Sequence, residues 1–194
     1  MKKILVVVFA VVVMLGAAQV NAQVPYVQVY FDEYWQTSVL PECPMDPPGS
    51  VVSTLYVVAH NFNMWMNGIE YMISYPTELT WLGDSIGPDR LSIGNSPTGI
   101  GITWPIPGNG FGGILAQTAN VLWMCQGCDA TNITISVLKH PSTPCSGPDC
   151  ANLVRAVRWP DLGLVFGVGM TSVVCPVIPV QETTWGGIKA QYND

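Results

Sequence analysis

The sequence predicts an all-β protein, a two-sheet β-sandwich or jelly roll of about nine strands with a short helical tail at its C-terminus. Three observations support this. Apolar and polar residues alternate in many short runs, which is the period of a strand with one buried face. The 19 glycines and 16 prolines divide these runs by turns. Before the tail, no apolar pattern keeps the helical period for more than two turns.

The first half of the sandwich begins with an alternating strand over residues 27–31. Both faces of the run 51–60 are mostly apolar, which is typical of a central strand. Asn67-Gly68 predicts a turn, and it leads into an alternating strand over 69–74. Further short strands are expected at 80–82, 91–93 and 100–104.

The second half opens after the glycine-rich stretch Gly108–Gly113. This stretch matches G-x-G-x-x-G by letter, but prolines precede it and a strand-like run follows, so it predicts a β-turn and not a nucleotide site. The cleanest alternation lies at 133–138, where one face is polar. The remaining strands are expected at 114–116, 119–125, 153–159, 164–166 and 173–178.

The tail has a different pattern. Thr184 can cap a short helix in which Trp185, Ile188 and Tyr192 share one face. Gly186 and Gly187 each weaken this helix by about 1 kcal/mol. A packed or frayed terminus and a recognition or attachment tail are both open interpretations.

The first 22 residues have the pattern of a secretory signal peptide. Two lysines precede the apolar run 4–15, and Val20-Asn21-Ala22 ends in the small residues of a cleavage site. We expect a signal peptide over 1–22, a sandwich domain over 23–180 and a tail over 181–194. The mature protein is then extracellular or periplasmic, and the sequence shows no second apolar segment for a transmembrane anchor.

Charge excludes some classes of partner. The whole chain has a formal net charge of −6, with 7 basic and 13 acidic residues. Two of the basic residues belong to the signal peptide, so the mature chain is more acidic still. Nucleic acids and anionic membrane surfaces are therefore unsuitable partners.

Six cysteines lie in the predicted mature chain. The pair Cys125-x2-Cys128 and the pair Cys145-x4-Cys150 have a zinc-ribbon-like spacing. Export favours disulfides instead, although six cysteines allow about 15 pairings. Bridges between the two pairs would join the ends of strand 133–138, and Cys43 and Cys175 would then remain to pair. A redox-active Cys-x-x-Cys needs a following helix, which the sequence does not predict.

Residues that could support catalysis are sparse, and we expect neither an enzyme nor a bound cofactor or metal ion. The serine-hydrolase motif G-x-S-x-G is absent. His60 falls in a strand and is expected to be packed, and His140 precedes a proline in a loop. Asp32-Glu33 and the pair Asp84 and Asp89 are candidates for glycoside hydrolysis or calcium binding, with solvated loop charges as the alternative.

Tryptophans are the remaining clue to a ligand. The chain has seven, and flat aromatic rings can be core residues or platforms for sugars. Trp123 and Trp159 match the core alternation. Trp35, Trp65 and Trp104 lie near predicted loops and are the candidates for an exposed binding surface.

The segment from Gly49 to Gly83 resembles the opening strands of cohesin domains. Its strand ends in a polar turn, a glycine-led strand follows, and Tyr75-Pro-x-x-Leu79 precedes the next strand. The run from Gly113 is similar to a later cohesin strand, so the resemblance extends from Gly49 to Ile178. It implies a cohesin-like fold. The six cysteines depart from the family pattern, so its dockerin-binding residues are not carried over.

The layout also resembles secreted bacterial proteins that have no assigned activity and end in Thr-Trp-Gly-x-Ile-Lys-x-x-Tyr, here Thr184 to Tyr192. This likeness implies export but no activity. The leading hypothesis is therefore a non-catalytic extracellular sandwich for adhesion or surface assembly, whose partner is a glycan or another cell-surface protein. A carbohydrate-binding module and a hydrolase of unrecognised type are the alternatives.

Overall fold

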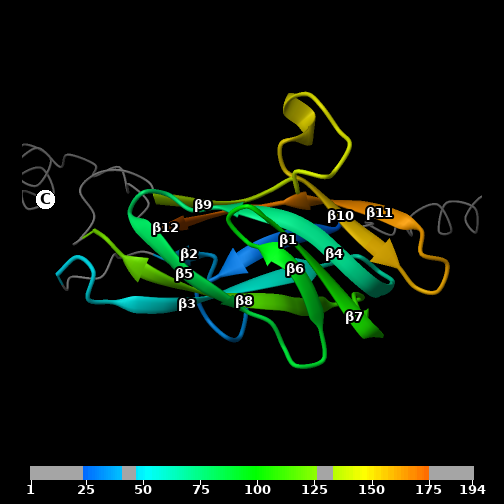
Figure 1. Ribbon diagram of the computed structural model, residues 1–194, viewed down its shortest axis with the longest axis horizontal. Helices are drawn as coiled ribbons and strands as arrows, with labels where there is room; N and C mark the ends of the chain where they lie inside the picture. Colours follow the sequence, from blue (N-terminus) through cyan, green and yellow to red (C-terminus); the bar gives the residue numbers. More distant parts are fainter. Residues whose placement is uncertain (1–23, 41–46, 126–132, 175–194) are drawn as a thin grey trace, which may run out of the picture.

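The computed structural model describes residues 24–40, 47–125 and 133–174. Its regular structure is almost entirely β, which confirms the predicted fold class (Figure 1). The strands are β1 (Tyr26–Tyr30), β2 (Val39–Leu40), β3 (Val52–His60), β4 (Trp65–Ser74), β5 (Leu79–Ser85), β6 (Leu91–Asn95), β7 (Gly99–Asn109), β8 (Gly113–Trp123), β9 (Ile133–Leu138), β10 (Leu153–Arg158), β11 (Leu164–Gly169) and β12 (Thr171–Val174). A single short 3-10 turn, Pro148–Cys150, is the one helical element in these ranges.

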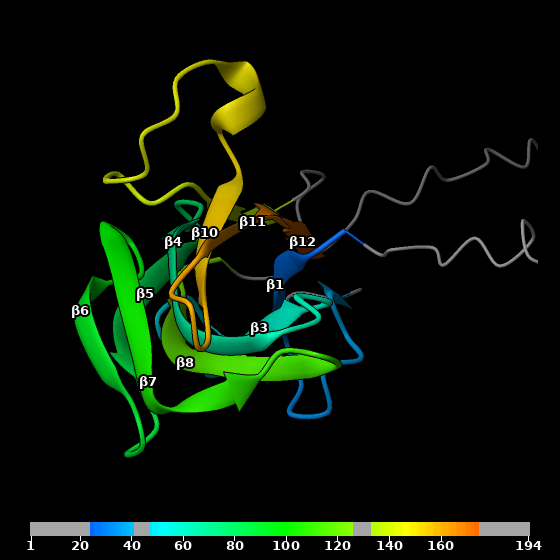
Figure 2. The same ribbon diagram turned by 90° about the vertical axis from the view of Figure 1, so that its right-hand side faces the viewer.

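The strands form two layers around one core (Figure 2). One layer has the order β5-β8-β3-β1, and its pairs are antiparallel. In the other, β4 pairs with β7 on one side and β10 on the other, and β6 extends beyond β7. The last residues of β4 pair with β9, which continues to β12 and β2. The layers are joined where β1 pairs in parallel with β11.

Alternation explains which face of each strand is buried. In β9, Ile133, Ile135 and Val137 are at most 5% exposed, whereas the residues between them reach toward solvent. Leu55, Val57 and Ala59 of β3 are fully buried in the same core. Burial of such side chains contributes about 1.5–3 kcal/mol each relative to exposure, which makes this core the main source of stability.

Several predicted elements differ from the observed ones. Asn67-Gly68 is not a turn but lies inside β4, where a β-bulge interrupts the pairing with β7. The two strands expected at 114–116 and 119–125 are one strand, β8, because the pairing with β3 runs on past Gln117. The strand expected at 173–178 begins earlier, at Thr171, and the rest of its range lies outside the described residues.

Two further expectations concern single features. Trp159, which matches the core alternation, is 47% exposed because β10 ends at Arg158 and the chain turns there. The glycine-rich stretch 108–113 contains the turn that the sequence predicts, and this turn leads from the end of β7 to the start of β8, two strands that do not pair with each other. The signal peptide and the helical tail with Trp185, Ile188 and Tyr192 lie outside the described residues. Among those described, no helix has the length and hydrophobicity to cross a bilayer.

Candidate functional site

The candidate site lies on the outer face of the strands β6, β7, β4 and β10. Paired residues on these four strands lie side by side and form rows across the sheet. Side chains alternate between the two faces along each strand, so every second row lies on the same face. The opposite face carries Ile69, Ile102 and Ala156 into the core. The outer rows are Ile93, Gly101, Glu70 and Arg155, and then Leu91, Thr103, Gly68 and Val157.

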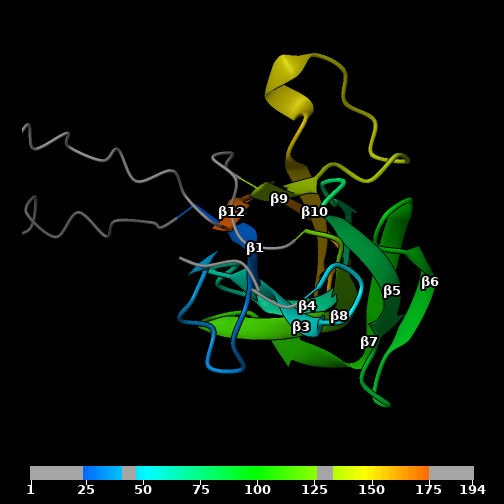
Figure 3. The ribbon, with the colours of Figure 1, turned by 90° about the vertical axis from the view of Figure 1, so that its left-hand side faces the viewer.

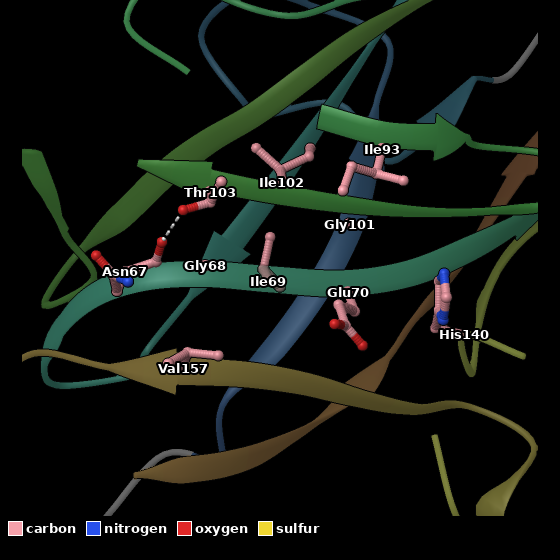
Figure 4. A pocket seen from close by; sticks show the side chains of 10 residues that line it. All are labelled: Asn67, Gly68, Ile69, Glu70, Ile93, Gly101, Ile102, Thr103, His140 and Val157. Carbon is pink, nitrogen blue, oxygen red and sulfur yellow. Dashed lines mark hydrogen bonds between the residues drawn. The ribbon is translucent and has the colours of Figure 1, made fainter. Parts of the chain in front are cut away.

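Two glycines hollow this face. Gly101 and Gly68 occupy outward positions on the two central strands, so no side chain fills the space above them. The result is a groove of about 300 Å³, with Ile93 on one wall and Val157 on the other (Figure 4). A Cβ at Gly101 would meet only the Glu70 Cγ atom, at 3.6 Å, which is an ordinary contact. The groove therefore results from the glycines and not from a gap between elements.

One end of the groove is defined by an ion pair. Arg155 donates a hydrogen bond from Nε to Glu70 Oε2 at 2.9 Å and a second from Nη2 to the same oxygen. The two side chains are 19% and 30% exposed, so solvent screens the pair only partly. The Glu70 Oε1 atom receives no hydrogen bond from any described residue, so the carboxylate that lines the groove keeps a free acceptor.

His140 lies at the same end, within a β-turn. The backbone N–H of Ser142 donates to His140 Nδ1 at 3.1 Å, and the Thr143 N–H donates to the His140 carbonyl at 2.9 Å. Because Nδ1 is an acceptor, the proton of the neutral ring is on Nε2. The Ser142 hydroxyl is also 2.8 Å from Nδ1, but Glu70 contacts that hydroxyl, at 3.5 Å, and not the ring. A catalytic triad needs the acid on the ring nitrogen opposite the serine, so these contacts describe a turn.

The loop after β9 projects away from the sheets (Figure 3), and His140 near its start lines the groove. Its base is closed by Lys139, whose N–H donates to the Ala151 carbonyl at 2.9 Å and whose Nζ donates to the Cys145 carbonyl. Within the loop Cys145 forms a disulfide with Cys150, with 5.8 Å between the Cα atoms.

The expected bridges from these two cysteines to Cys125 and Cys128 are therefore wrong, because Cys145 and Cys150 lie close enough to pair with each other. The zinc-ribbon alternative also loses two of its four thiolates. Cys125 has no disulfide partner within the described ranges, and burial raises the pKa of its thiol. Cys43, Cys128 and Cys175 lie outside the described residues.

The three tryptophans predicted as an exposed surface have three different environments. Trp65 is 49% exposed at the start of β4, as predicted. Trp104 is 2% exposed, so its predicted exposure is wrong: it points from β7 into the core. Trp35 is half-buried, and its ring lies edge-on to His60 with 6.3 Å between centroids. The structure does not bring these three rings together.

The carboxylate candidates are likewise separate. Asp84 accepts four hydrogen bonds, from Trp81 Nε1, the Ser96 N–H, the Ser96 hydroxyl and Gln117 Nε2, at 3.1, 2.7, 2.7 and 3.2 Å. Asp89 is exposed and pairs with Arg90. Asp32 accepts backbone N–H groups of its own loop. These contacts give Asp84 and Asp32 structural roles, and no cluster of three or more potential metal ligands occurs in the part of the chain that the structure describes.

His60 is packed as predicted, at the end of β3. Its ring stacks on Tyr26 with 4.9 Å between centroids and meets Tyr30 edge-on at 5.6 Å. Burial lowers the pKa of His60, although a hydrogen bond with the Gly112 backbone opposes that shift. The neutral ring is therefore the form that the folded protein favours.

This lowered pKa predicts a loss of stability in acid. The unfolded chain binds a proton at His60 near pH 6.5, while the folded chain resists it. The free energy of unfolding should therefore be constant above about pH 6.5 and fall as the pH drops from there to the lower folded pKa. Urea unfolding across pH 5–8 measures this dependence. His60→Gln should flatten it and His140→Gln should not; an equal slope in wild type and His60→Gln would contradict the assignment.

Comparison with known proteins finds similarity in structure only. No protein-family model matches the chain, and no curated protein matches its sequence. The sixth cohesin of scaffoldin B from Acetivibrio cellulolyticus, solved in complex with a dockerin, has a TM-score of 0.46 at 11% identity and covers 77% of this chain and 95% of its own. The seventh ScaB type I cohesin from Pseudobacteroides cellulosolvens has a TM-score of 0.41 at 9% identity, covering 82% and 97%.

The major pilin subunit BcpA of Bacillus cereus is also similar, with a TM-score of 0.45 at 5% identity, covering 77% of this chain and 39% of the pilin. Cohesins are thus among the structures that this chain is similar to, as the sequence resemblance predicts. The likeness concerns the fold, and the binding partners of these proteins are not carried over to this chain.

The sequence analysis does not predict the groove. The sequence pattern predicts a turn at Gly68 and places Gly101 inside the strand expected at 100–104. A glycine within a strand pattern often marks a close approach of backbone or ligand, and that signal was present at both positions. The neighbourhood of Glu70 and Arg155 depends on the pairing of β4 with β10, which spans 85 residues of sequence.

Proposed function

We propose that this chain is a non-catalytic extracellular β-sandwich that acts in adhesion or surface assembly, and that the groove over Gly101 and Gly68 is its contact surface for another protein. The single observation that carries the proposal is this hollow on an otherwise continuous sheet face, with strongly exposed aliphatic side chains along its rim.

The rim supports contact with a protein partner. Ile93 is 85% exposed and Leu91 is 64% exposed, and both lie on the same face of β6. Covering such side chains contributes about 25 cal/mol per Å² of apolar area removed from water. Neighbouring exposed aliphatic residues beside a polar patch are typical of interaction surfaces.

The polar end of the groove supports directional binding. Glu70 Oε1 is an acceptor and His140 Nε2–H is a donor, so the pair can bond the C=O and N–H groups of a partner backbone. Arg155 holds the Glu70 carboxylate in place before binding, which reduces the entropy cost of ordering it. An apolar hollow with an oriented polar end fits an aliphatic side chain and its neighbouring peptide group.

Filling the groove tests the proposal. Gly101→Val places a branched side chain where the partner would sit, and the modest crowding at the Cβ position predicts that the sandwich still folds. In a sedimentation assay of the purified mature protein with cell envelopes of the producing organism, we expect at least tenfold weaker association of the variant than of the wild type.

Gly112→Val is the matched control, because a Cβ at Gly112 meets nothing within 4 Å and the residue lies in the β7–β8 turn. It should associate like the wild type, and circular dichroism should show all three proteins folded. A wild-type protein that remains a monomer without envelope association would refute the proposed function. Equal association of Gly101→Val and the wild type would refute the groove as its site.

A further inference from the structure

A second hollow lies at the other end of β4, between two tryptophans. Trp65 begins β4, and Trp159 follows the last residue of β10. The Trp159 N–H donates to the Trp65 carbonyl at 2.8 Å, which fixes the two residues side by side. They are 49% and 47% exposed, and both line a cleft of about 260 Å³ together with Ile106 and Pro107.

The third wall of the cleft comes from an irregularity in β7. Thr103 pairs with Gly68 and Gly108 pairs with Met66, so four residues of β7 lie opposite the single residue Asn67. Within this bulge Trp104 turns into the core, while Ile106 is 83% exposed. Prolines at 105 and 107 restrict the backbone on both sides of Ile106. The wall is therefore held in place before any ligand binds, so binding loses little conformational entropy there.

Charged hydrogen-bonding groups flank Trp159 in the sequence and are also held in place. Arg158 donates from Nε and Nη2 to the two carboxylate oxygens of Asp161, at 3.0 and 2.5 Å. The Gly163 N–H donates to the same carboxylate at 3.1 Å. Arg158 and Asp161 are about half exposed, so unused donors and lone pairs remain accessible from solvent.

We infer that the Trp65–Trp159 cleft binds a neutral glycan, with sugar rings stacked against the two indoles. The apolar face of a pyranose ring covers an indole, and its equatorial hydroxyls bond to polar groups nearby. Arg158 directly precedes Trp159 in the chain and Asp161 follows it by two residues, which makes them the candidate polar partners. The four lining residues carry no charge and the chain has a net charge of −6, which disfavours an anionic polymer. The site is distinct from the groove over Gly101 and does not depend on it.

The experiment titrates the purified mature protein with cellohexaose, xylohexaose and mannohexaose, followed by calorimetry and tryptophan fluorescence. We expect saturable binding of at least one of these neutral hexasaccharides, with at least tenfold weaker binding in Trp65→Ala and in Trp159→Ala. Phe111→Ala is the matched control, because Phe111 is 53% exposed in the β7–β8 turn. That variant should bind like the wild type, and circular dichroism should show all variants folded.

Three results would overturn the inference. The first is the absence of binding to all three hexasaccharides, and the second is binding that neither tryptophan variant weakens. The third is binding of decaproline without sugar binding, because exposed aromatic clefts also accept polyproline helices. Gly101→Val should keep the sugar binding of the wild type, so a failure of this inference is separable from a failure of the groove as a protein contact site.

Discussion

Replacing Trp104 by alanine is expected to lower the free energy of unfolding by about 4 kcal/mol, within the range for truncating a large buried aromatic residue. The indole is 2% exposed within the core of the sandwich. The Arg90 guanidinium lies over its ring, 5.7 Å from the centroid, and would lose that contact as well. Urea unfolding followed by circular dichroism measures the change.

Trp65→Ala is the matched comparison, because it removes the same side chain from a half-exposed position in the neighbouring strand. Its effect on the free energy of unfolding should stay near or below about 1 kcal/mol. The sequence predicts the same exposure for Trp65 and Trp104, since each lies near a predicted loop. Similar losses of stability in both variants would contradict the inward orientation of Trp104.

Replacing Asp84 by alanine is expected to cost about 3 kcal/mol of unfolding free energy. The carboxylate accepts four hydrogen bonds that connect β5, the turn between β6 and β7, and β8. Ser96 is fully buried, so its N–H and hydroxyl would lose their acceptor and gain no water in exchange. Thermal and urea unfolding should both show the loss.

Asp89→Ala provides the control for this prediction. Asp89 is exposed and pairs only with its neighbour Arg90, and such surface pairs contribute about 0–1 kcal/mol. The sequence presents Asp84 and Asp89 as a possible carboxylate pair for catalysis or calcium. Equal effects of the two substitutions, or stabilisation of the wild type by calcium that Asp84→Ala abolishes, would contradict the structural role of Asp84.

Strands were predictable where alternation was strong. The run 133–138 was predicted with its bounds and buried face correct, because β-branched residues on one side and polar residues on the other admit only one orientation. Prediction failed where glycine interrupted the pattern. In the sequence, Asn67-Gly68 fits both a turn and the interior of a strand. It lies inside a strand because β4 pairs with both β7 and β10 at this position.

The candidate surfaces were predictable only in part. The sequence correctly predicts exposure of Trp65, but it places Trp159 in the core because that residue continues the alternation of β10. The strand ends one residue earlier, so the alternation no longer determines the direction of that side chain. The exposure of an aromatic residue depends on where its strand ends and on what covers it, and both are properties of the assembled sheets.

The β-sandwich follows from the sequence alone, since period-two alternation is a local property that each strand carries independently. The sequence also predicts an export signal, and its composition makes the chain acidic. Which residues meet depends on the packing of the sheets: Gly101 lies near Gly68 in a groove, Arg155 contacts Glu70, Cys145 bonds to Cys150, and Trp65 lies beside Trp159. Strand order and register create these neighbours, and they arise from packing between segments far apart in the chain, which no local pattern records.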